Sequence, residues 1–466
     1  MQNTYLAIDF GGGSGRVIAA RISEEKNGKT LCMEEIHRFP NYTVRIGDYL
    51  YWDFPYLFNE MKKGLSIAAS RYDNVVSVGI DTWGVDFGLV DSDGNLIGNP
   101  IAYRDPHTLG LPEKFMAENN PLRHYSEIGI QILPINTLFR LWSMAKNRDP
   151  RLKIASHLLF MPDLFGYYLT GKTGNEYTIA STSELLKARN KDWDKNLIES
   201  IGIDPKIFGK ILMPGSIRGK LLKDIAEETG LPENVNVVSV GSHDTASAVF
   251  AESDDYSKSG TVFLSSGTWS LLGVVLEEPI LDEKAYAADY TNEGGVEGKI
   301  TFLTNITGLW ILQRLKSQWD NEGLGLDWSE LTDEAEKAGD VDVINVDDPL
   351  FQDPDNMKGR IQQYCKDNGL RVPGTPGEFM KCVCLSLATR YKKAIDDLNK
   401  ILPQPARQLK IFGGGAKNKL LNKWTSEITG LEVITGNAEA TAIGNILVQA
   451  IASGEIKDRS EIKEYK

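Results

Sequence analysis

The sequence predicts an α/β protein made of two related domains that hold a phosphorylated ligand between them. A pattern of β-branched strand, small glycine turn and second β-branched strand occurs at residues 5–20 and again at 261–275. Each such turn can present several backbone N–H groups to one phosphate oxygen. A chain of 466 residues is also too long for a single core of ordinary size, so two or three domains are expected.

The composition is that of an ordinary soluble globular protein. The net charge of −13 gives an acidic surface that repels nucleic acid, so a phosphorylated ligand needs backbone amides and a divalent metal. No apolar run reaches 18 residues and no basic, then apolar leader opens the chain, so we expect neither a membrane span nor a secretory signal. Cys32, Cys365, Cys382 and Cys384 show no CxxC spacing, which favours structural thiols in a reducing cytoplasm.

The opening segment is rich in β-structure and differs from the usual nucleotide-binding units. Its first glycine turn leads into a strand, whereas the turn of a Rossmann unit leads into a helix. Gly11-Gly12-Gly13 also lacks the Gly-x-Gly-x-x-Gly spacing and has no P-loop lysine. The aromatic and polar segment 40–55 is expected to be a loop. The expected elements around it are strands at 4–10, 15–22 and 31–39, a helix near 56–71 and a strand at 75–80.

The middle of the chain, residues 102–214, is irregular and rich in helix, and we expect insertions that face a substrate and supply a lid. A helix at 221–229 then ends at Gly230, and a buried strand at 235–240 ends in the polar cluster 241–245. The second β-rich unit begins near Thr261.

The remaining C-terminal part carries clear helix and strand signals. Thr375 can cap a helix that Pro376 begins, and Glu378 completes a capping box. Apolar residues recur at helical spacing as far as Leu398. The chain ends at Lys466 in a charged segment that resembles the start of a further helix, which leaves the C-terminal boundary open. The other expected elements are strands at 408–412 and 432–435 and helices at 418–429 and 439–452.

Two aspartates stand where phosphoryl transfer needs carboxylates. Asp9 ends the first strand beside the glycine turn, where Mg²⁺ would offset its repulsion of a phosphate, although a turn aspartate bonded to local N–H groups fits too. Asp244 follows a buried strand and begins a helix. It could be only a helix cap, or it could be the general base that accepts a hydroxyl proton, since a helix N-terminus keeps a carboxylate ionised.

Three further segments are candidates for ligand contacts. His243 could orient Asp244 or bind substrate, or it could be a satisfied core histidine. Segment 80–88 combines Trp83 with carboxylates at a strand end, which suits a small polyol but also a structural turn. The glycines at 413–415 could let adenosine approach the backbone, or they could form an ordinary tight turn.

These motifs resemble the FGGY carbohydrate kinases, and the resemblance extends from Asp9 to about Gly444. It implies a duplicated ribonuclease-H-like fold of the actin, hexokinase and Hsp70 superfamily. ATP would lie in the cleft between an N-terminal domain, 1–240, and a C-terminal domain, 241–466. The segments that carry the resemblance are 9–11, 14–16, 81–87, 102–105, 241–249, 265–270, 291–295, 308–310 and 413–415.

The resemblance also implies an activity, the Mg²⁺-dependent transfer of the γ-phosphate of ATP to the 1-hydroxyl of L-rhamnulose. The enzyme would be cytoplasmic, with a ketose and ATP as partners and with no nucleic acid or membrane. The family base falls on Asp244, and Asp9 would be the metal ligand. Sugar contacts fall on Gly84, His243, Asp244, Thr245 and Asn305. ATP contacts fall on Gly12, Gly13, Ser14, Gly15 and Arg16 in the first loop, on Thr268 in the second, and on Gln313 and Gly415.

One departure concerns the first loop, which carries Gly12-Gly13 where related sequences often carry Ala or Ser. Its grip on phosphate would therefore depend more on backbone than on side chains.

Other functions stay compatible with these residues. The chain could be another FGGY kinase that acts on L-fuculose or xylulose, an actin-like ATPase switch, or a catalytically silent sugar-binding regulator. A sugar kinase needs both Asp244 and the polar strand end at 82–84, and an ATPase switch needs neither. The regulator has little support while Asp9, Asp244 and Thr268 are all present. Neither the ketose stereochemistry nor the oligomeric state follows from the sequence.

Overall fold

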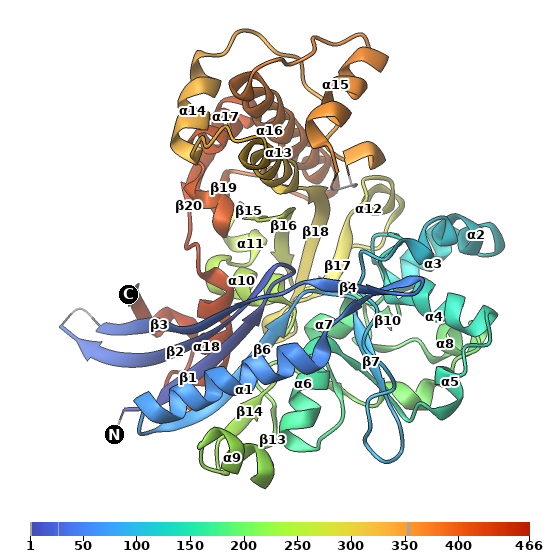
Figure 1. Ribbon diagram of the computed structural model, residues 1–466, viewed down its shortest axis with the longest axis vertical. Coiled ribbons are helices and arrows are strands. Elements are labelled where there is room, and N and C mark those ends of the chain that lie inside the picture. Colours follow the sequence, from blue (N-terminus) through green and yellow to red (C-terminus); the bar gives the residue numbers. More distant parts are fainter. Residues whose placement is uncertain (1, 27, 352–354) are drawn as a thin grey trace.

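Two large sheets, each covered by helices, organise the protein (Figure 1). The computed structural model describes residues 2–26, 28–351 and 355–466. Within these residues one sheet has seven strands in the order β13-β14-β6-β1-β2-β3-β21, and the other has six in the order β17-β18-β16-β15-β19-β20. The expected α/β fold class is confirmed.

The first sheet contains the first glycine turn. Strand β1 (Thr4–Phe10) pairs antiparallel with β2 (Ser14–Glu25), and β2 pairs antiparallel with β3 (Gly28–Pro40). On its other edge β1 pairs parallel with β6 (Val75–Thr82), which pairs parallel with β14 (Asn236–Val238). Strand β13 (Ile217–Lys220) continues the sheet beyond β14.

The second sheet repeats this topology around the second turn. Strand β15 (Thr261–Ser266) pairs antiparallel with β16 (Trp269–Leu276), and β16 with β18 (Ile300–Thr307). Strand β15 also pairs parallel with β19 (Gln408–Phe412), which pairs parallel with β20 (Glu432–Thr435). The order β3-β2-β1-β6-β14 therefore matches β18-β16-β15-β19-β20, which confirms the expected duplication. Strand β17 (Thr291–Gly294) extends the second sheet beside β18.

The two faces of β1 pack against different helices, as the period of two in a strand requires. Leu6 and Ile8 join the cluster that contains Leu57 and Met61 of α1 (Phe54–Arg71). Tyr5 joins the cluster formed with α18 (Ala440–Ala452) on the opposite face. Helix α18 also packs on α10 (Asp244–Glu252), and α10 contacts β15 of the second sheet. The pair α10–α18 thus connects the two sheets.

The region between β6 and β13 forms its own helical layer with a separate apolar core, as the irregular sequence of 102–214 suggested. Its helices are α2 (Leu111–Glu118), α3 (Pro121–Ile128), α4 (Thr137–Lys146), α5 (Arg151–Ile154), α6 (Met161–Thr170), α7 (Tyr177–Ser181) and α8 (Lys195–Ser200). Its short strands are β7 (Phe87–Val90), β8 (His157–Phe160), β9 (Asn175–Glu176), β10 (Leu186–Lys187), β11 (Asp192–Trp193) and β12 (Ile211–Leu212). Helix α9 (Lys223–Thr229) ends at Gly230 in the left-handed conformation, as expected.

Helices gather over the second sheet at the top of Figure 1, around the long helix α16 (Pro376–Ile401). Its expected capping box is confirmed: the Thr375 hydroxyl accepts the Glu378 N–H at 3.2 Å, and Glu378 accepts the Thr375 N–H at 3.1 Å. The other helices of this half are α11 (Tyr256–Ser259), α12 (Glu283–Ala287), α13 (Trp310–Asn321), α14 (Trp328–Lys337), α15 (Met357–Asp367) and α17 (Lys419–Thr429). Short 3₁₀ turns lie at Pro106–Thr108, Pro205–Phe208, Val296–Gly298, Pro349–Phe351, Gly414–Lys417 and Arg459–Glu461.

Two expectations about the fold were wrong. The segment 40–55 is not a loop, because it contains the hairpin of β4 (Thr43–Ile46) and β5 (Tyr49–Trp52), which turns at Gly47 with a φ of +59°. The C-terminal segment does not begin a helix. It forms β21 (Ile462–Tyr465), parallel to β3, because the open edge of β3 supplies backbone partners that a four-residue helix could not.

Within the described ranges, none of the helices has the length and apolar character needed to cross a membrane. All four cysteines are free thiols. The division of the chain at residues 240 and 241 stays a prediction.

Gly444 lets α18 approach α10 closely, because a Cβ at this position would lie 1.8 Å from the carbonyl oxygen of Ser247. We predict that Gly444→Ala separates the two helices and lowers the unfolding free energy by about 1–3 kcal/mol, the usual cost of overpacking. Thermal unfolding should show a drop of several degrees. Gly339→Ala is the control: a Cβ at this exposed position meets no neighbour and its backbone is not left-handed, so the unfolding temperature should change little.

Candidate active site

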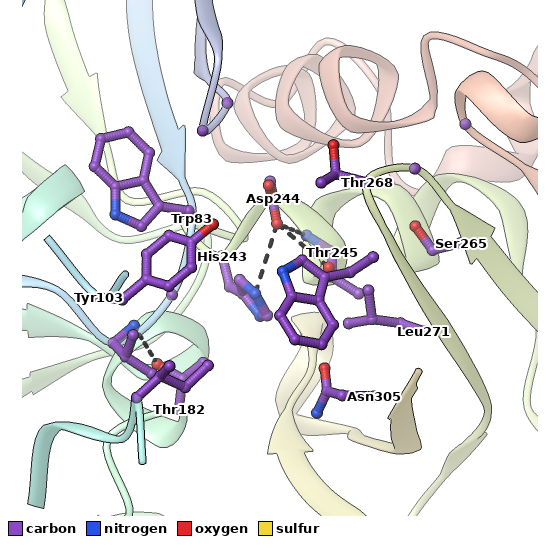
Figure 2. Close-up of a pocket in the computed structure, with 18 of the residues that line it drawn as sticks. Trp83, Tyr103, Thr182, His243, Asp244, Thr245, Ser265, Thr268, Leu271 and Asn305 are labelled. Atoms are coloured by element: carbon purple, nitrogen blue, oxygen red, sulfur yellow. Dashed lines mark hydrogen bonds and ion pairs between the residues drawn. The ribbon is translucent and has the colours of Figure 1, made fainter. Parts of the chain in front are cut away.

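A cavity of about 560 Å³ lies where the two glycine turns meet. In Figure 2, Trp83 and Tyr103 stand on one side and Thr268 and Leu271 on the other, with Asp244 between them. Both sheets and the helical layer therefore contribute to one site. Of the expected site residues, the cavity is lined by Gly12, Gly13, Gly84, His243, Asp244, Thr245, Thr268, Asn305 and Gln313.

Each glycine turn is closed by a backbone hydrogen bond, and the bond of the first turn spans one residue more than that of the second. The Gly11 N–H donates to the Ser14 carbonyl at 2.9 Å, and the Gly267 N–H donates to the Trp269 carbonyl at 2.8 Å. In each case the closed turn leaves neighbouring backbone facing the cavity. The Thr268 hydroxyl lies 3.4 Å from the Gln313 side-chain oxygen, so these two expected ATP contacts are neighbours.

The rest of the first loop lies behind the cavity wall. Gly15 belongs to β2 and supports the ring of Phe39, which a Cβ would meet at 2.3 Å. Arg16 forms an ion pair with Asp9 at 2.5 Å and another with Glu439. Ser14, Gly15 and Arg16 are thus in β2 rather than on the cavity surface.

The third glycine segment contributes through its first two members. Gly413 and Gly414 line the cavity, whereas Gly415 packs against Ser266 so closely that a Cβ would meet its hydroxyl oxygen. Gly413 has a φ of +79°, which favours glycine. Residues 413–414 therefore bring backbone to the cavity, and Gly415 supports them through its contact with Ser266.

Asp244 is held at the cavity by the extension of a parallel strand pair. The Thr82 N–H donates to the Ser242 carbonyl at 2.9 Å, which places the end of β6 beside the segment that enters α10. The Asp244 carboxylate accepts the Thr245 N–H at 2.6 Å, and its side chain is 33% exposed. Burial raises its pKa, His243 opposes this and Asp9 adds to it, so the pKa is raised overall.

His243 lies between two carboxylates. Its Nε2 is 3.5 Å from Asp244 Oδ1, and its Nδ1 is 3.2 Å from Glu293 Oε2 (Figure 2 draws the first contact). Burial lowers the pKa of His243, but the adjacent carboxylate of Glu293, together with the charge of Asp244, outweighs burial and raises it. The imidazole of His243 therefore binds a proton more readily than a free histidine does.

A buried carboxylate holds the backbone of this segment. Glu176 Oε2 accepts the Ser242 N–H at 3.2 Å and the Thr178 hydroxyl at 2.6 Å. That hydroxyl accepts the His243 N–H at 3.1 Å. Burial raises the pKa of Glu176 to about 8, although bonds to Thr178 oppose the shift. The helical layer thus positions the residues that precede Asp244.

Asp9 and Asp81 face each other across the parallel pair β1–β6. Asp81 is fully buried; burial first, and then the charge of Asp9, raise its pKa well above the ordinary value. Asn445 donates to Asp81 Oδ2 at 2.5 Å, while Asp81 Oδ1 has no hydrogen-bond partner. A divalent cation fits this arrangement, because it would relieve the repulsion and use the unpartnered oxygen. No set of three or more His, Cys, Asp or Glu side chains in the described residues is placed to hold a metal alone.

Segment 80–88 brings its tryptophan, Trp83, to the cavity but not its carboxylates, and a polyol contact stays a prediction. Asp86 is fully buried and accepts hydrogen bonds from the indoles of Trp52 at 2.6 Å and Trp83 at 2.9 Å, and it pairs with Arg140 at 2.9 Å. Its role is to fix the indole of Trp83, since a buried charge must be satisfied locally.

Gly84 and Val85 form a constrained turn in the wall. Val85 has a φ of +63°, which is rare for a β-branched residue. The turn is held because Thr182 accepts the Val85 N–H at 3.0 Å and Thr137 donates to the Val85 carbonyl at 2.6 Å. A Cβ on Gly84 would lie 3.3 Å from Thr182, so glycine keeps this wall open.

Several residues of the site escaped the sequence analysis. Gln131 accepts from the Asn305 side chain at 3.0 Å and from its backbone N–H at 3.3 Å, which joins the helical layer to the second sheet. Arg104 stacks over Trp310 at 4.6 Å across the same gap. Gln131 stands in an irregular segment without periodicity, so only proximity in the fold identifies it. Glu293 stands in segment 291–295, which the sequence analysis did recognise. Its spacing of two residues from Thr291 places both side chains on one face of a strand, and this is the signal that could have identified it.

Comparisons with known proteins agree on one family. The N-terminal domain model of the FGGY family of carbohydrate kinases matches residues 4–251, and the C-terminal domain model matches residues 262–453. A protein named rhamnulokinase from Bacteroides thetaiotaomicron is 40% identical over 465 residues, which cover 100% of this chain and 94% of the relative. Another rhamnulokinase, from Oceanobacillus iheyensis, is 37% identical and covers 100% and 96%.

Solved structures show the same fold at lower identity. A ligand-bound xylulose kinase from Lactobacillus acidophilus has a TM-score of 0.81 at 14% identity, over 98% of this chain and 91% of that one. The glycerol kinase of Plasmodium falciparum with ADP has a TM-score of 0.79 at 16% identity, with the same coverage. The expected actin- and hexokinase-like architecture is thereby confirmed.

Proposed function

The chain belongs to the FGGY family of carbohydrate kinases, and we propose that it transfers the γ-phosphate of ATP to the 1-hydroxyl of L-rhamnulose, giving L-rhamnulose 1-phosphate. The observation that carries this proposal is the position of Asp244, whose partly exposed carboxylate faces the cavity between the two glycine turns. The choice of ketose is supported by full-length relatives named rhamnulokinase.

In the proposed reaction the 1-hydroxyl oxygen attacks the γ-phosphorus, and its proton passes to the Asp244 carboxylate. The bond from the γ-phosphorus to the bridging oxygen breaks, and ADP leaves with the electron pair. His243 stabilises the ionised form of Asp244. Backbone at Gly12, Gly13 and Gly267 would hold the phosphates, as suits a transfer that depends on positioning and charge.

Mg²⁺ is the expected cofactor, and Asp9 and Asp81 are the carboxylates that would hold it. When bound it would neutralise charge on the polyphosphate. Asp81 has an unpartnered oxygen that would be available to the ion.

We infer a cytoplasmic enzyme whose partners are a ketose and ATP; four free thiols suit a reducing compartment. Other FGGY kinase activities, on L-fuculose or xylulose, are the runner-up. Membership of a carbohydrate kinase family does not favour an ATPase switch or a silent sugar-binding regulator.

An assay of ADP release with L-rhamnulose, L-fuculose, L-xylulose and glycerol tests the proposal. The proposal expects the highest kcat/KM with L-rhamnulose and little ADP release without a sugar. A higher kcat/KM with another ketose would replace the substrate and keep the enzyme class. ADP release that no sugar stimulates would contradict a sugar kinase.

We predict that Glu176→Ala lowers kcat by roughly 10–10²-fold, because the backbone that precedes Asp244 loses its support. Glu176→Gln should lower kcat less than Glu176→Ala does, because its side-chain oxygen can still accept the Ser242 N–H. Its NH₂ group would face a second hydrogen-bond donor, so kcat should not be fully retained. Steady-state kinetics and thermal unfolding of both variants check this. Glu199→Ala, an exposed glutamate on α8, is the matched control. Equal kcat in all three variants would remove Glu176 from this positioning role.

A further inference from the structure

Strand β17 presents two buried polar side chains to the cavity. Thr291 and Glu293 both line it, and the residue between them points away, since Asn292 bonds to Gly129 and Ile280 behind the strand. This alternation is the period of two expected in a strand. Thr291 is 1% exposed and Glu293 is 7% exposed.

Both side chains have unused hydrogen-bonding capacity. Thr291 Oγ1 and Glu293 Oε2 have no hydrogen-bond partner in the structure, and neither does Nδ1 of His243. The contact of 3.2 Å between His243 and Glu293 is therefore an ion pair without hydrogen-bond alignment. Buried polar groups are normally hydrogen-bonded, so an unpartnered threonine hydroxyl beside a carboxylate held only by an ion pair points to a polar ligand at this end of the cavity.

The arrangement relative to Asp244 suggests which part of the ligand this is. His243 contacts Asp244 through Nε2 and Glu293 through Nδ1, so the imidazole separates the candidate base from Glu293. A ketose whose reacting hydroxyl meets Asp244 would extend past the imidazole toward β17. Its further hydroxyls would then meet a carboxylate and a threonine hydroxyl.

We propose that Glu293 and Thr291 bind the hydroxyl groups of the ketose away from the reacting one and thereby select among ketoses. This inference rests on the proposed function, and it assigns the selection to two residues of one strand. A carboxylate accepts from a hydroxyl only in the right direction, so a change of configuration at one carbon leaves the carboxylate unpaired. Rejection by unpaired buried groups is stronger than rejection by size alone.

The test compares Glu293→Gln and Thr291→Val with the wild type on L-rhamnulose, L-fuculose and L-xylulose. L-fuculose differs from L-rhamnulose in configuration at one carbon. For Glu293→Gln we expect KM for the preferred ketose to rise about 10–100-fold and its preference over the epimer to fall about 10-fold. KM for Mg-ATP should stay within about twofold, because only ketose binding is altered. Thr291→Val should also raise KM for the preferred ketose and lower the preference over the epimer, each by a smaller factor than Glu293→Gln does.

Glu278→Gln, an exposed glutamate on the same half of the protein, is the matched control. Unfolding temperatures separate a binding defect from misfolding, and Thr291→Val decides the matter if Glu293→Gln does not fold. An unchanged preference among ketoses in folded variants would overturn the inference while the proposed function stands. If the wild type prefers another ketose, that ketose replaces L-rhamnulose as the proposed substrate. The KM values and preferences of the same variants are then compared on that ketose. A wild type that phosphorylates no ketose would overturn both.

Discussion

Asp244→Asn is expected to lower kcat by roughly 10²–10⁴-fold, the usual contribution of a general base. Asparagine has nearly the same shape and can still accept the Thr245 N–H, so the N-terminus of α10 should stay folded. What it cannot do is take the proton of the attacking hydroxyl. Affinity for Mg-ATP, measured by calorimetry, should change little, because the glycine turns are untouched.

The pH dependence should identify the same group. A carboxylate with a raised pKa binds a proton more readily, so its ionised fraction is lost at a higher pH than that of an aspartate at the ordinary 3.8. In the wild type, kcat/KM should fall as the pH drops through this raised pKa. The residual activity of Asp244→Asn should lack that acidic limb.

Asp224→Asn provides the control, since Asp224 is an exposed aspartate in the first turn of α9. It should behave as the wild type in both rate and pH profile. Near-normal turnover in Asp244→Asn, or an acidic limb that persists in it, would remove Asp244 from the role of base.

Much of the fold could be predicted because its signals are local. The capping box at Thr375, the glycine after α9 and the two strand–turn–strand units each depend on a few adjacent residues. Strand β21 could not be predicted this way. It forms because β3, more than 400 residues away, has an open edge, and nothing in a charged segment before Lys466 encodes that partner.

The site residues also divide into those with a local sequence signal and those without one. Asp244 and Thr268 stand in motifs where backbone and side chain form one local unit. Gln131 reaches the site only because the segment that follows α3 lies beside β18 in space, and its partner Asn305 lies 174 positions away. Asp86 shows the opposite error, since a carboxylate beside Trp83 suggested a sugar contact, while the fold uses that charge to fix two indoles.

Asp9→Ala is expected to lower kcat/KM for Mg-ATP by about 10²–10³-fold, the typical effect of removing one group that stabilises developing charge in an enclosed site. Asp9 lies between the first glycine turn and Asp81, and its charge raises the pKa of both Asp81 and Asp244. Without it, Asp81 alone would have to hold the cation, and KM for Mg-ATP should rise. Arg16 keeps its ion pair with Glu439, so β2 should remain in place.

Removing Asp9 should also shift the pH dependence of kcat/KM, which a general loss of stability would not do. Because its charge raises the pKa of Asp244, removing it should move the acidic limb of kcat/KM to lower pH, while KM for the ketose changes little. Glu35→Ala removes another carboxylate, 3.8 Å from Arg16, that is outside the cavity, and it should alter neither quantity. Calorimetry with unchanged Mg-nucleotide affinity, together with a normal kcat, would show that Asp9 only anchors Arg16.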